Sequence, residues 1–128
     1  MTLVEAVLAL MIALLSAVAF FQLFAFGTIE LEKLGYRREA LELLKGEMEF
    51  WRARFQSASI DSPVRTDEAG RRARRTQSPG GIEFQVEPEV SAPLQDRDLR
   101  YQELRVRVSY GRGDLADTVE MKTNQYVR

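Results

Sequence analysis

The chain has 128 residues and a net charge of −1, and it contains neither cysteine nor histidine. This charge gives no global attraction to nucleic acid or acidic lipid. The missing side chains exclude disulfides, thiolate or imidazole metal sites, a cysteine nucleophile and histidine-based proton transfer. We therefore expect a protein that is not an enzyme and that has no catalytic, cofactor-binding or metal-binding residues.

Residues 1–29 are apolar and carry one charged side chain, Glu5. The uncharged run from Ala6 to Ile29 exceeds the about 20 residues that a helix needs to cross the hydrocarbon core of a bilayer. A cleaved secretory signal is disfavoured because no basic residue precedes Lys33. A plain membrane anchor explains the length, but a carboxylate close to lipid is costly and usually serves a function. The run predicts a helix that lies in lipid or inside an assembly.

Charged side chains of both signs return after Ile29, while apolar side chains continue at helical spacing on one face. The first proline of the chain is Pro63. We therefore expect one helix over about 1–57, with an amphipathic second half over 30–57. Its predicted apolar seam consists of Leu34, Leu41, Leu44, Met48, Trp51 and Phe55.

The remaining region, 58–128, predicts a small antiparallel sheet with loops over 58–81 and 88–98 and a hairpin turn at 111–114. Three of its segments alternate apolar and polar residues, so each has one dry and one wet face. Three strands cannot bury a dry face alone. We expect an α+β fold in which a three- to four-stranded sheet packs on the C-terminal half of the helix. The expected dry face includes Phe84, Val86, Val106, Val108, Val119 and Met121.

Glu5 allows two compatible interpretations. Thr2 and Glu5 have the spacing of a capping box, in which the hydroxyl and the carboxylate bind backbone N–H groups of the first turn. Alternatively, identical apolar helices pack side by side with an axial offset, and Glu5 of one copy meets the N-terminal amine of another. That amine is the only positive group before Lys33, and an uncompensated carboxylate in an apolar core is strongly disfavoured. Such pairing would set the stagger between subunits.

The N-terminal sequence Met1-Thr-Leu-Val-Glu5, followed by Ala-Val-Leu-Ala-Leu-Met-Ile-Ala-Leu-Leu, resembles the mature N-terminus of type IV pilins and of the pseudopilins of type II secretion. In that family a prepilin peptidase removes a short basic leader, and the new first residue is N-methylated. The resemblance implies that Met1 is this residue and that Met1, Thr2 and Glu5 set the subunit register. The side chains implied to form the filament core are Leu3, Val4, Val7, Leu8, Leu10, Met11, Leu14, Leu15, Val18 and Phe21.

The resemblance also implies partners and a location. The partners are other pilin or pseudopilin subunits, an inner-membrane assembly platform, the peptidase and the lipid bilayer. The location is the bacterial inner membrane, with one pass and a periplasmic C-terminus, and then a periplasmic or extracellular filament. Met1 and the small sheet look most similar to the minor pseudopilin I and minor pilin V groups. Positions 13–26 hold no glycine or proline, unlike many major pilins, so we expect a straight helix.

Two alternatives remain. One is a single-span membrane protein with a periplasmic binding module, in which Glu5 is only a cap. The other is a minor pilin for DNA uptake, because phosphate contacts need only basic side chains. Asp67 and Glu68 partly neutralise the basic cluster and no aromatic residue interleaves with it, so we favour a solvated or subunit-pairing cluster over DNA. The cluster consists of Arg71, Arg72, Arg74 and Arg75.

Overall fold

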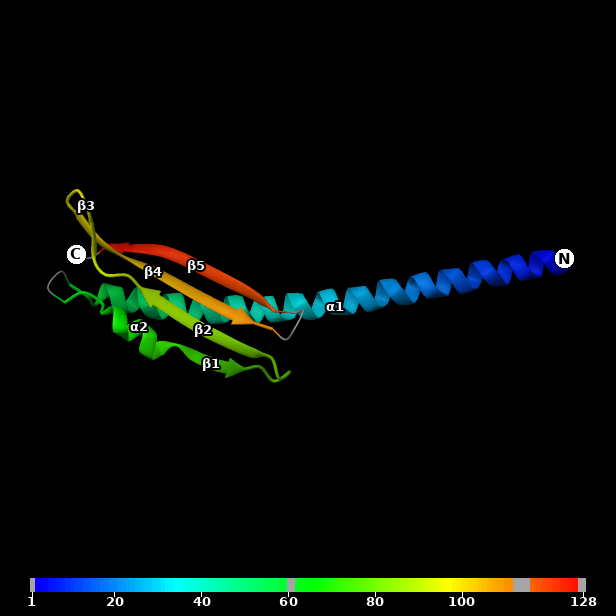
Figure 1. Cartoon of the computed structure of the whole chain (residues 1–128), viewed down its shortest axis with the longest axis horizontal. Helices are drawn as coiled ribbons and strands as arrows, with labels where there is room; N and C mark the ends of the chain where they lie inside the picture. Colours follow the sequence, from blue (N-terminus) through cyan, green and yellow to red (C-terminus); the bar gives the residue numbers. More distant parts are fainter. Residues whose placement is uncertain (1, 60–61, 112–115, 127–128) are drawn as a thin grey trace. The chain divides into compact units, whose positions relative to one another are not determined.

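The computed structural model describes residues 2–59, 62–111 and 116–126. It contains one long helix, α1, Leu3–Gln56, followed by a short helix and an antiparallel sheet (Figure 1). The predicted α+β class is therefore confirmed, and α1 ends close to the predicted bounds of 1–57. The helix stops where the Ser57 hydroxyl donates to the Arg54 carbonyl oxygen at 2.8 Å, which satisfies a carbonyl that lacks a helical partner.

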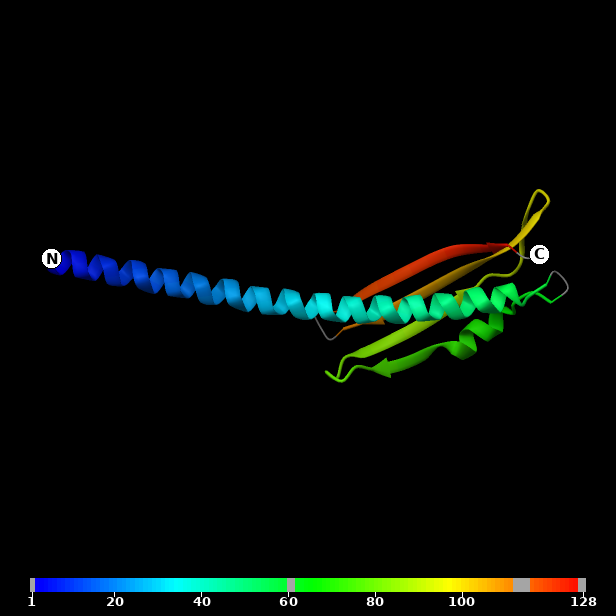
Figure 2. The ribbon, with the colours of Figure 1, turned by 180° about the vertical axis from the view of Figure 1, so that it is seen from behind.

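The chain divides into two compact units, which we call the apolar unit, Met1–Gly35, and the packed unit, Tyr36–Arg128. α1 contributes to both. The described part of the apolar unit is helical apart from Thr2. In the packed unit, α1 lies against one face of the sheet (Figure 2). The two units are described separately below.

The central strand of the sheet is β4, Leu99–Tyr110. One edge of β4 pairs with β2, Glu83–Val90, and the other edge pairs with β5, Asp117–Tyr126. β1, Arg74–Gln77, extends the sheet beyond β2, and β3, Leu94–Asp96, pairs with the first residues of β4. All of these pairs are antiparallel.

The register places the dry sides of neighbouring strands in rows. Val108 of β4 lies opposite both Val86 of β2 and Val119 of β5. All three side chains are buried, as the alternation of apolar and polar residues in these strands requires. Residues 112–114 of the predicted hairpin turn, 111–114, lie outside the described residues.

In the part of the chain that the structure describes, the sheet has five strands, not the expected three to four. β1 and the short helix α2, Thr66–Arg72, lie inside the predicted loop 58–81, and β3 lies inside the predicted loop 88–98. β1 reads Arg-Arg-Thr-Gln and lacks apolar alternation, because an edge strand needs only backbone pairing. β2 continues to Val90, into the predicted loop 88–98, although a proline disfavours the interior of a strand. Since β1 pairs with β2 only as far as Val86, no described strand pairs with that edge at Pro88, and no N–H donor is required there.

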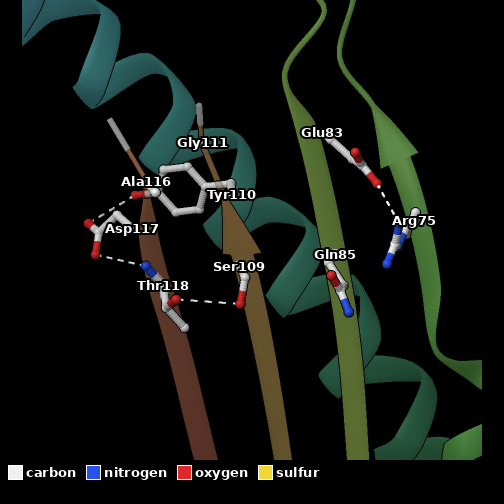
Figure 3. A pocket seen from close by; sticks show the side chains of 9 residues that line it. All are labelled: Arg75, Glu83, Gln85, Ser109, Tyr110, Gly111, Ala116, Asp117 and Thr118. Atoms are coloured by element: carbon white, nitrogen blue, oxygen red, sulfur yellow. Dashed lines mark hydrogen bonds and ion pairs between the residues drawn. The ribbon is translucent and has the colours of Figure 1, made fainter. Parts of the chain in front are cut away.

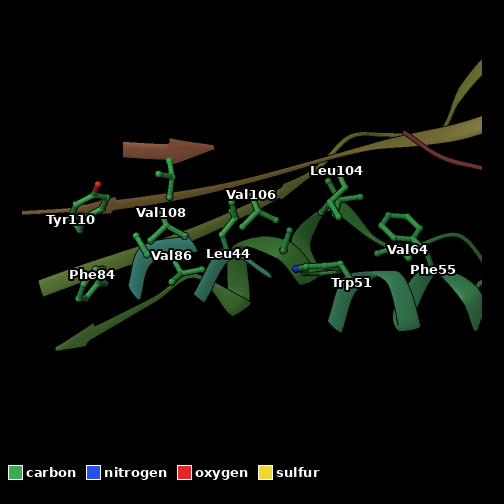
Figure 4. Packing of buried hydrophobic residues seen from close by; sticks show 14 of the residues in the cluster. Leu44, Trp51, Phe55, Val64, Phe84, Val86, Leu104, Val106, Val108 and Tyr110 are labelled. Atoms are coloured by element: carbon green, nitrogen blue, oxygen red, sulfur yellow. The ribbon is translucent and has the colours of Figure 1, made fainter. Parts of the chain in front are cut away.

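The core of the packed unit lies between α1 and the sheet (Figure 4). From α1, Ala40, Leu44, Trp51 and Phe55 are buried at alternating helical spacing. Val64, in the segment before α2, covers the end of this core near Phe55. The buried apolar side chains of the central strands include Phe84, Val86, Val90, Leu104, Val106, Val108 and Tyr110.

The predicted seam of α1 was wrong at its N-terminal end. Its members at seven-residue spacing become steadily more exposed toward the N-terminus. Phe55 is 6% exposed, Met48 is half-buried, Leu41 is 46% exposed and Leu34 is 60% exposed. A seven-residue repeat drifts by about 20° per step around a straight helix, so the line turns away from the sheet. The seam members Leu44, Trp51 and Phe55 are buried as predicted, and Ala40 takes the buried face in place of Leu41.

Met121 was also wrongly assigned to the core, because it is 47% exposed. It points toward the same side of the sheet as the buried Val119, two residues earlier in β5. β5 is an edge strand and pairs only with β4. The helix α1 therefore covers the Met121 side chain on one side only. Beside this side chain lies a groove of about 420 Å³, which Leu41 and Met48 also line.

Candidate functional site

The first turn of α1 is closed by two reciprocal hydrogen bonds. The Thr2 backbone N–H donates to Glu5 Oε2 at 2.8 Å, and the Glu5 backbone N–H donates to Thr2 Oγ1 at 3.4 Å. These are the two bonds of a capping box. Both residues are exposed. The other predicted register residue, Met1, lies outside the described residues.

The apolar unit presents its large apolar side chains to the outside. Within the described chain, α1 is the one helix long and apolar enough to cross a membrane. The side chains predicted for the filament core have exposed fractions of 53–84%. An isolated helix with this surface needs lipid or other helices around it, because water disfavours exposed apolar area. The members are Leu3, Val4, Val7, Leu8, Leu10, Met11, Leu14, Leu15, Val18 and Phe21.

Two of the three polar side chains between Ala6 and Ile29 are satisfied by their own helix. Ser16 Oγ donates to the Ile12 carbonyl oxygen, and Thr28 Oγ1 donates to the Ala25 carbonyl oxygen, both at 2.8 Å. Such bonds let hydroxyl groups enter an apolar medium at low cost. This part of α1 is therefore suited to lipid despite its hydroxyl groups.

The packed unit buries a carboxylate, Glu47, which is 0% exposed. Its Oε1 accepts hydrogen bonds from Trp51 Nε1 at 3.0 Å and from Arg72 Nε. Its Oε2 lies 3.2 Å from an Arg74 guanidinium nitrogen but is not aligned with it for a hydrogen bond. Burying a carboxylate is tolerated only when opposite charge and donors surround it. Arg72 and Arg74 provide that charge.

The basic cluster is consequently used within the packed unit. The Arg72 guanidinium also lies over the Phe50 ring, 3.4 Å from its centroid, as a cation over an aromatic face does. Arg71 pairs with Asp67 at 3.2 Å and Arg75 with Glu83 at 3.5 Å. Each of the four arginines therefore faces a carboxylate of the same chain, and Arg72 and Arg74 both reach the buried Glu47.

A second ion pair joins α1 to α2. Arg54 Nε and a terminal guanidinium nitrogen donate to the two carboxylate oxygens of Glu68 at 3.1 and 3.0 Å. This parallel arrangement is the strong geometry of an arginine–carboxylate pair. The hydrogen bonds and the charge of Glu68 raise the pKa of Arg54. The pair holds α2, which lies within the predicted loop 58–81, against α1.

Sequence patterns did not single out Gln102, which is fully buried in β4. Its amide nitrogen donates to the carbonyl oxygens of Val64 and Ser91 at 2.7 and 3.1 Å, and its amide oxygen accepts from the Val64 backbone N–H at 3.2 Å. All three bonds reach irregular backbone rather than strand. Gln102 therefore fastens two connecting segments to the sheet. Its position in line with the buried apolar residues of β4 was the available signal.

A hollow of about 580 Å³ lies at one end of the sheet of the packed unit (Figure 3). There the Tyr110 hydroxyl donates to Asp117 Oδ2 at 3.3 Å. Burial, followed by the charge of Asp117, raises the pKa of Tyr110. The raised pKa keeps the Tyr110 hydroxyl protonated. Within the described residues, no group of three or more acidic side chains could hold a metal ion.

Comparisons with known protein families, with curated proteins and with solved structures find no match for this chain.

Proposed function

We propose that this protein is a structural subunit of a filament of the type IV pilus kind, either a pilus or a type II secretion pseudopilus. Its N-terminal helix polymerises, and its packed unit lies on the outside of the filament. Before assembly the subunit resides in the bacterial inner membrane as a single-pass protein. Its partners are other subunits and a separate assembly machine.

The observation that carries the proposal is the exposed apolar surface of α1. The helix continues without a break from the apolar unit into the packed unit. The packed unit completes its own core with one face of α1, whereas the apolar unit leaves its large apolar side chains exposed. Lipid before assembly and neighbouring helices after it would provide the missing cover.

Glu5 would set the register of this assembly. In the single chain its carboxylate caps the helix and stays at the surface. A neighbouring copy with an axial offset can bring its terminal amine to the remaining carboxylate oxygen. Because an uncompensated charge is strongly disfavoured in an apolar core, staggers that pair Glu5 are selected over those that do not.

The second candidate is a single-span anchor that carries a periplasmic binding module. The reciprocal bonds between Thr2 and Glu5 favour it, because they account for Glu5 without a second subunit. The two candidates therefore differ in whether Glu5 is needed for its charge or only for its hydrogen bonds.

The substitution Glu5→Gln separates these roles. Glutamine can replace glutamate in a capping box, so the variant keeps the cap but cannot pair with an amine. In the source cells we expect normal amounts of Glu5→Gln in the inner membrane and at least about tenfold less sheared filament, because breaking a buried ion pair costs several kcal/mol. The matched control is Glu30→Gln, which removes an exposed acid paired with Lys33 and should leave filament yield unchanged.

Mass spectrometry of the native N-terminus provides an independent test. A filament subunit of this family should begin at a methylated Met1.

Wild-type filament yield from Glu5→Gln would reject the pairing role of the charge. An unmodified start, together with a wild-type protein that stays in the membrane and forms no filament, would favour the anchor.

A further inference from the structure

Gln22 is the third polar side chain between Ala6 and Ile29, and it differs from the other two. Ser16 and Thr28 donate to carbonyl groups of their own helix. The Gln22 amide makes no side-chain hydrogen bond within the described residues, and the side chain is exposed on α1. Its two N–H donors and its carbonyl acceptor are therefore available to a partner.

Gln22 would lie inside the hydrocarbon layer of a membrane. The midpoint of the Ala6–Ile29 run lies near Val18, so the Gln22 backbone is within roughly 7 Å of it along the helix axis. Half of the hydrocarbon core is about 15 Å thick. At this depth water is scarce, and an amide without a hydrogen-bond partner is costly.

The position of Gln22 on the helix points to a helical partner. Alternate steps of four and three residues lead from Val4 through Leu15 and Val18 to Gln22, and then to Ile29. This is the spacing of a seam along which two helices pack. Apart from Gln22, every position on this line is apolar. A single polar side chain in such a seam selects the register and the number of helices that meet.

We infer that Gln22 pairs with Gln22 of a second copy of this chain, in a parallel, in-register dimer within the membrane. Copies inserted with one topology are parallel, and a twofold axis along the membrane normal brings identical residues together. Each amide can then donate to the carbonyl oxygen of the other. The amide is complementary to itself because it carries both donors and an acceptor, whereas a lipid chain has no hydrogen-bonding group.

This inference rests on the membrane-stored state of the proposed function but not on the filament. The in-register dimer has no axial offset, whereas pairing of Glu5 requires one, so the same two copies cannot hold both contacts at once. The dimer must therefore separate before a subunit joins a filament. It would hold subunits in a form that does not polymerise.

Disulfide trapping tests the register directly. The chain contains no cysteine, so single-cysteine variants of the full chain report one position each. In vesicles of phosphatidylethanolamine and phosphatidylglycerol, with no other protein present, mild oxidation should couple Val18→Cys and Ala25→Cys on the seam. Ala13→Cys lies on the opposite face of α1 and should couple much less.

Fluorescence transfer between labelled chains in the same vesicles measures the strength of association. We expect Gln22→Leu to weaken dimerisation about three- to tenfold, the range for hydrogen bonds between membrane helices. Ser16→Ala is the matched control and should have no effect, because its hydroxyl is already satisfied. Glu5→Gln should also leave the dimer unchanged, which separates this inference from the filament proposal.

Three results would overturn the dimer. One is equal coupling at Val18→Cys and Ala13→Cys, another is an unchanged association constant for Gln22→Leu, and the third is a wild-type chain that stays monomeric in vesicles. Loss of association in Glu5→Gln with none in Gln22→Leu would show that the terminal ion pair sets the contact instead. The disulfide-trapping and fluorescence-transfer results do not depend on whether the wild type forms filaments.

Discussion

Between Ala6 and Ile29 of the apolar unit, apolar side chains surround α1 on all sides and stay exposed, whereas in the packed unit the same helix buries one face against a sheet. The difference follows from composition. A helix with charged residues on most of its surface can complete its core with strands of its own chain. A partner that packs on one face of a helix leaves the other faces exposed, so it cannot cover a helix that is apolar on all faces. Only lipid or several other helices can enclose it.

Polar groups differ between the two units in the same way. In the apolar unit, Thr2, Ser16 and Thr28 bond within one or two turns of their own helix. In the packed unit, Glu47 and Gln102 reach partners far away in the sequence. Local bonds leave the apolar unit independent of the rest of the chain. Distant bonds make the packed unit a cooperative structure.

The largest effect within the packed unit should come from Glu47→Ala. It removes the acceptor of the buried Trp51 N–H and the partner of Arg72 and Arg74, so we expect a loss of about 3–5 kcal/mol in the free energy of unfolding. Trp51 is the only tryptophan. Its near-UV circular dichroism in the detergent-solubilised full chain therefore reports unfolding of this unit alone.

Glu49→Ala serves as the control for Glu47→Ala. It removes an exposed acid that pairs with Lys45 at 4.0 Å, and such pairs contribute less than about 1 kcal/mol. Equal losses in the two variants would show that Glu47 does not hold the buried position described.

A smaller effect separates two residues of the predicted seam of α1, one that is buried against the sheet and one that is exposed. Leu44 is 2% exposed and Leu41 is 46% exposed. We expect Leu44→Ala to lower the free energy of unfolding by about 2–5 kcal/mol, because it leaves a cavity, and Leu41→Ala by less than about 1 kcal/mol. Thermal unfolding monitored through Trp51 measures both. A larger loss for Leu41→Ala would mean that the seam faces the sheet after all.

The smallest effect concerns the pH dependence of the packed unit. Burial and the charge of Asp117 raise the pKa of Tyr110 in the folded state. The protonated tyrosine therefore contributes stability fully below its unfolded pKa of about 10, and this contribution is lost as pH rises through the folded pKa. The difference in unfolding free energy between wild type and Tyr110→Phe should shrink as the pH rises above about 10. A difference that grows with pH would contradict the direction of the shift.

The sequence by itself determined the long helix, the fold class and the central strands. Residues 1–57 lack proline and keep helical spacing, and the segments around Phe84, Val106 and Val119 alternate in character. The Thr2–Glu5 spacing also predicted the cap seen at the first turn. Each of these features depends on residues close together in the chain, so local periodicity is enough to reveal it.

Only the tertiary structure decided which face of α1 is buried and what the arginine cluster does. β1 and β3 carry little local signal, because backbone pairing with a neighbour creates them. The direction of Arg72 and Arg74 depends on Glu47, a residue more than twenty positions earlier that became their partner only when α1 packed on the sheet. Contacts between distant residues are absent from local patterns, because they exist only after the chain has closed its core.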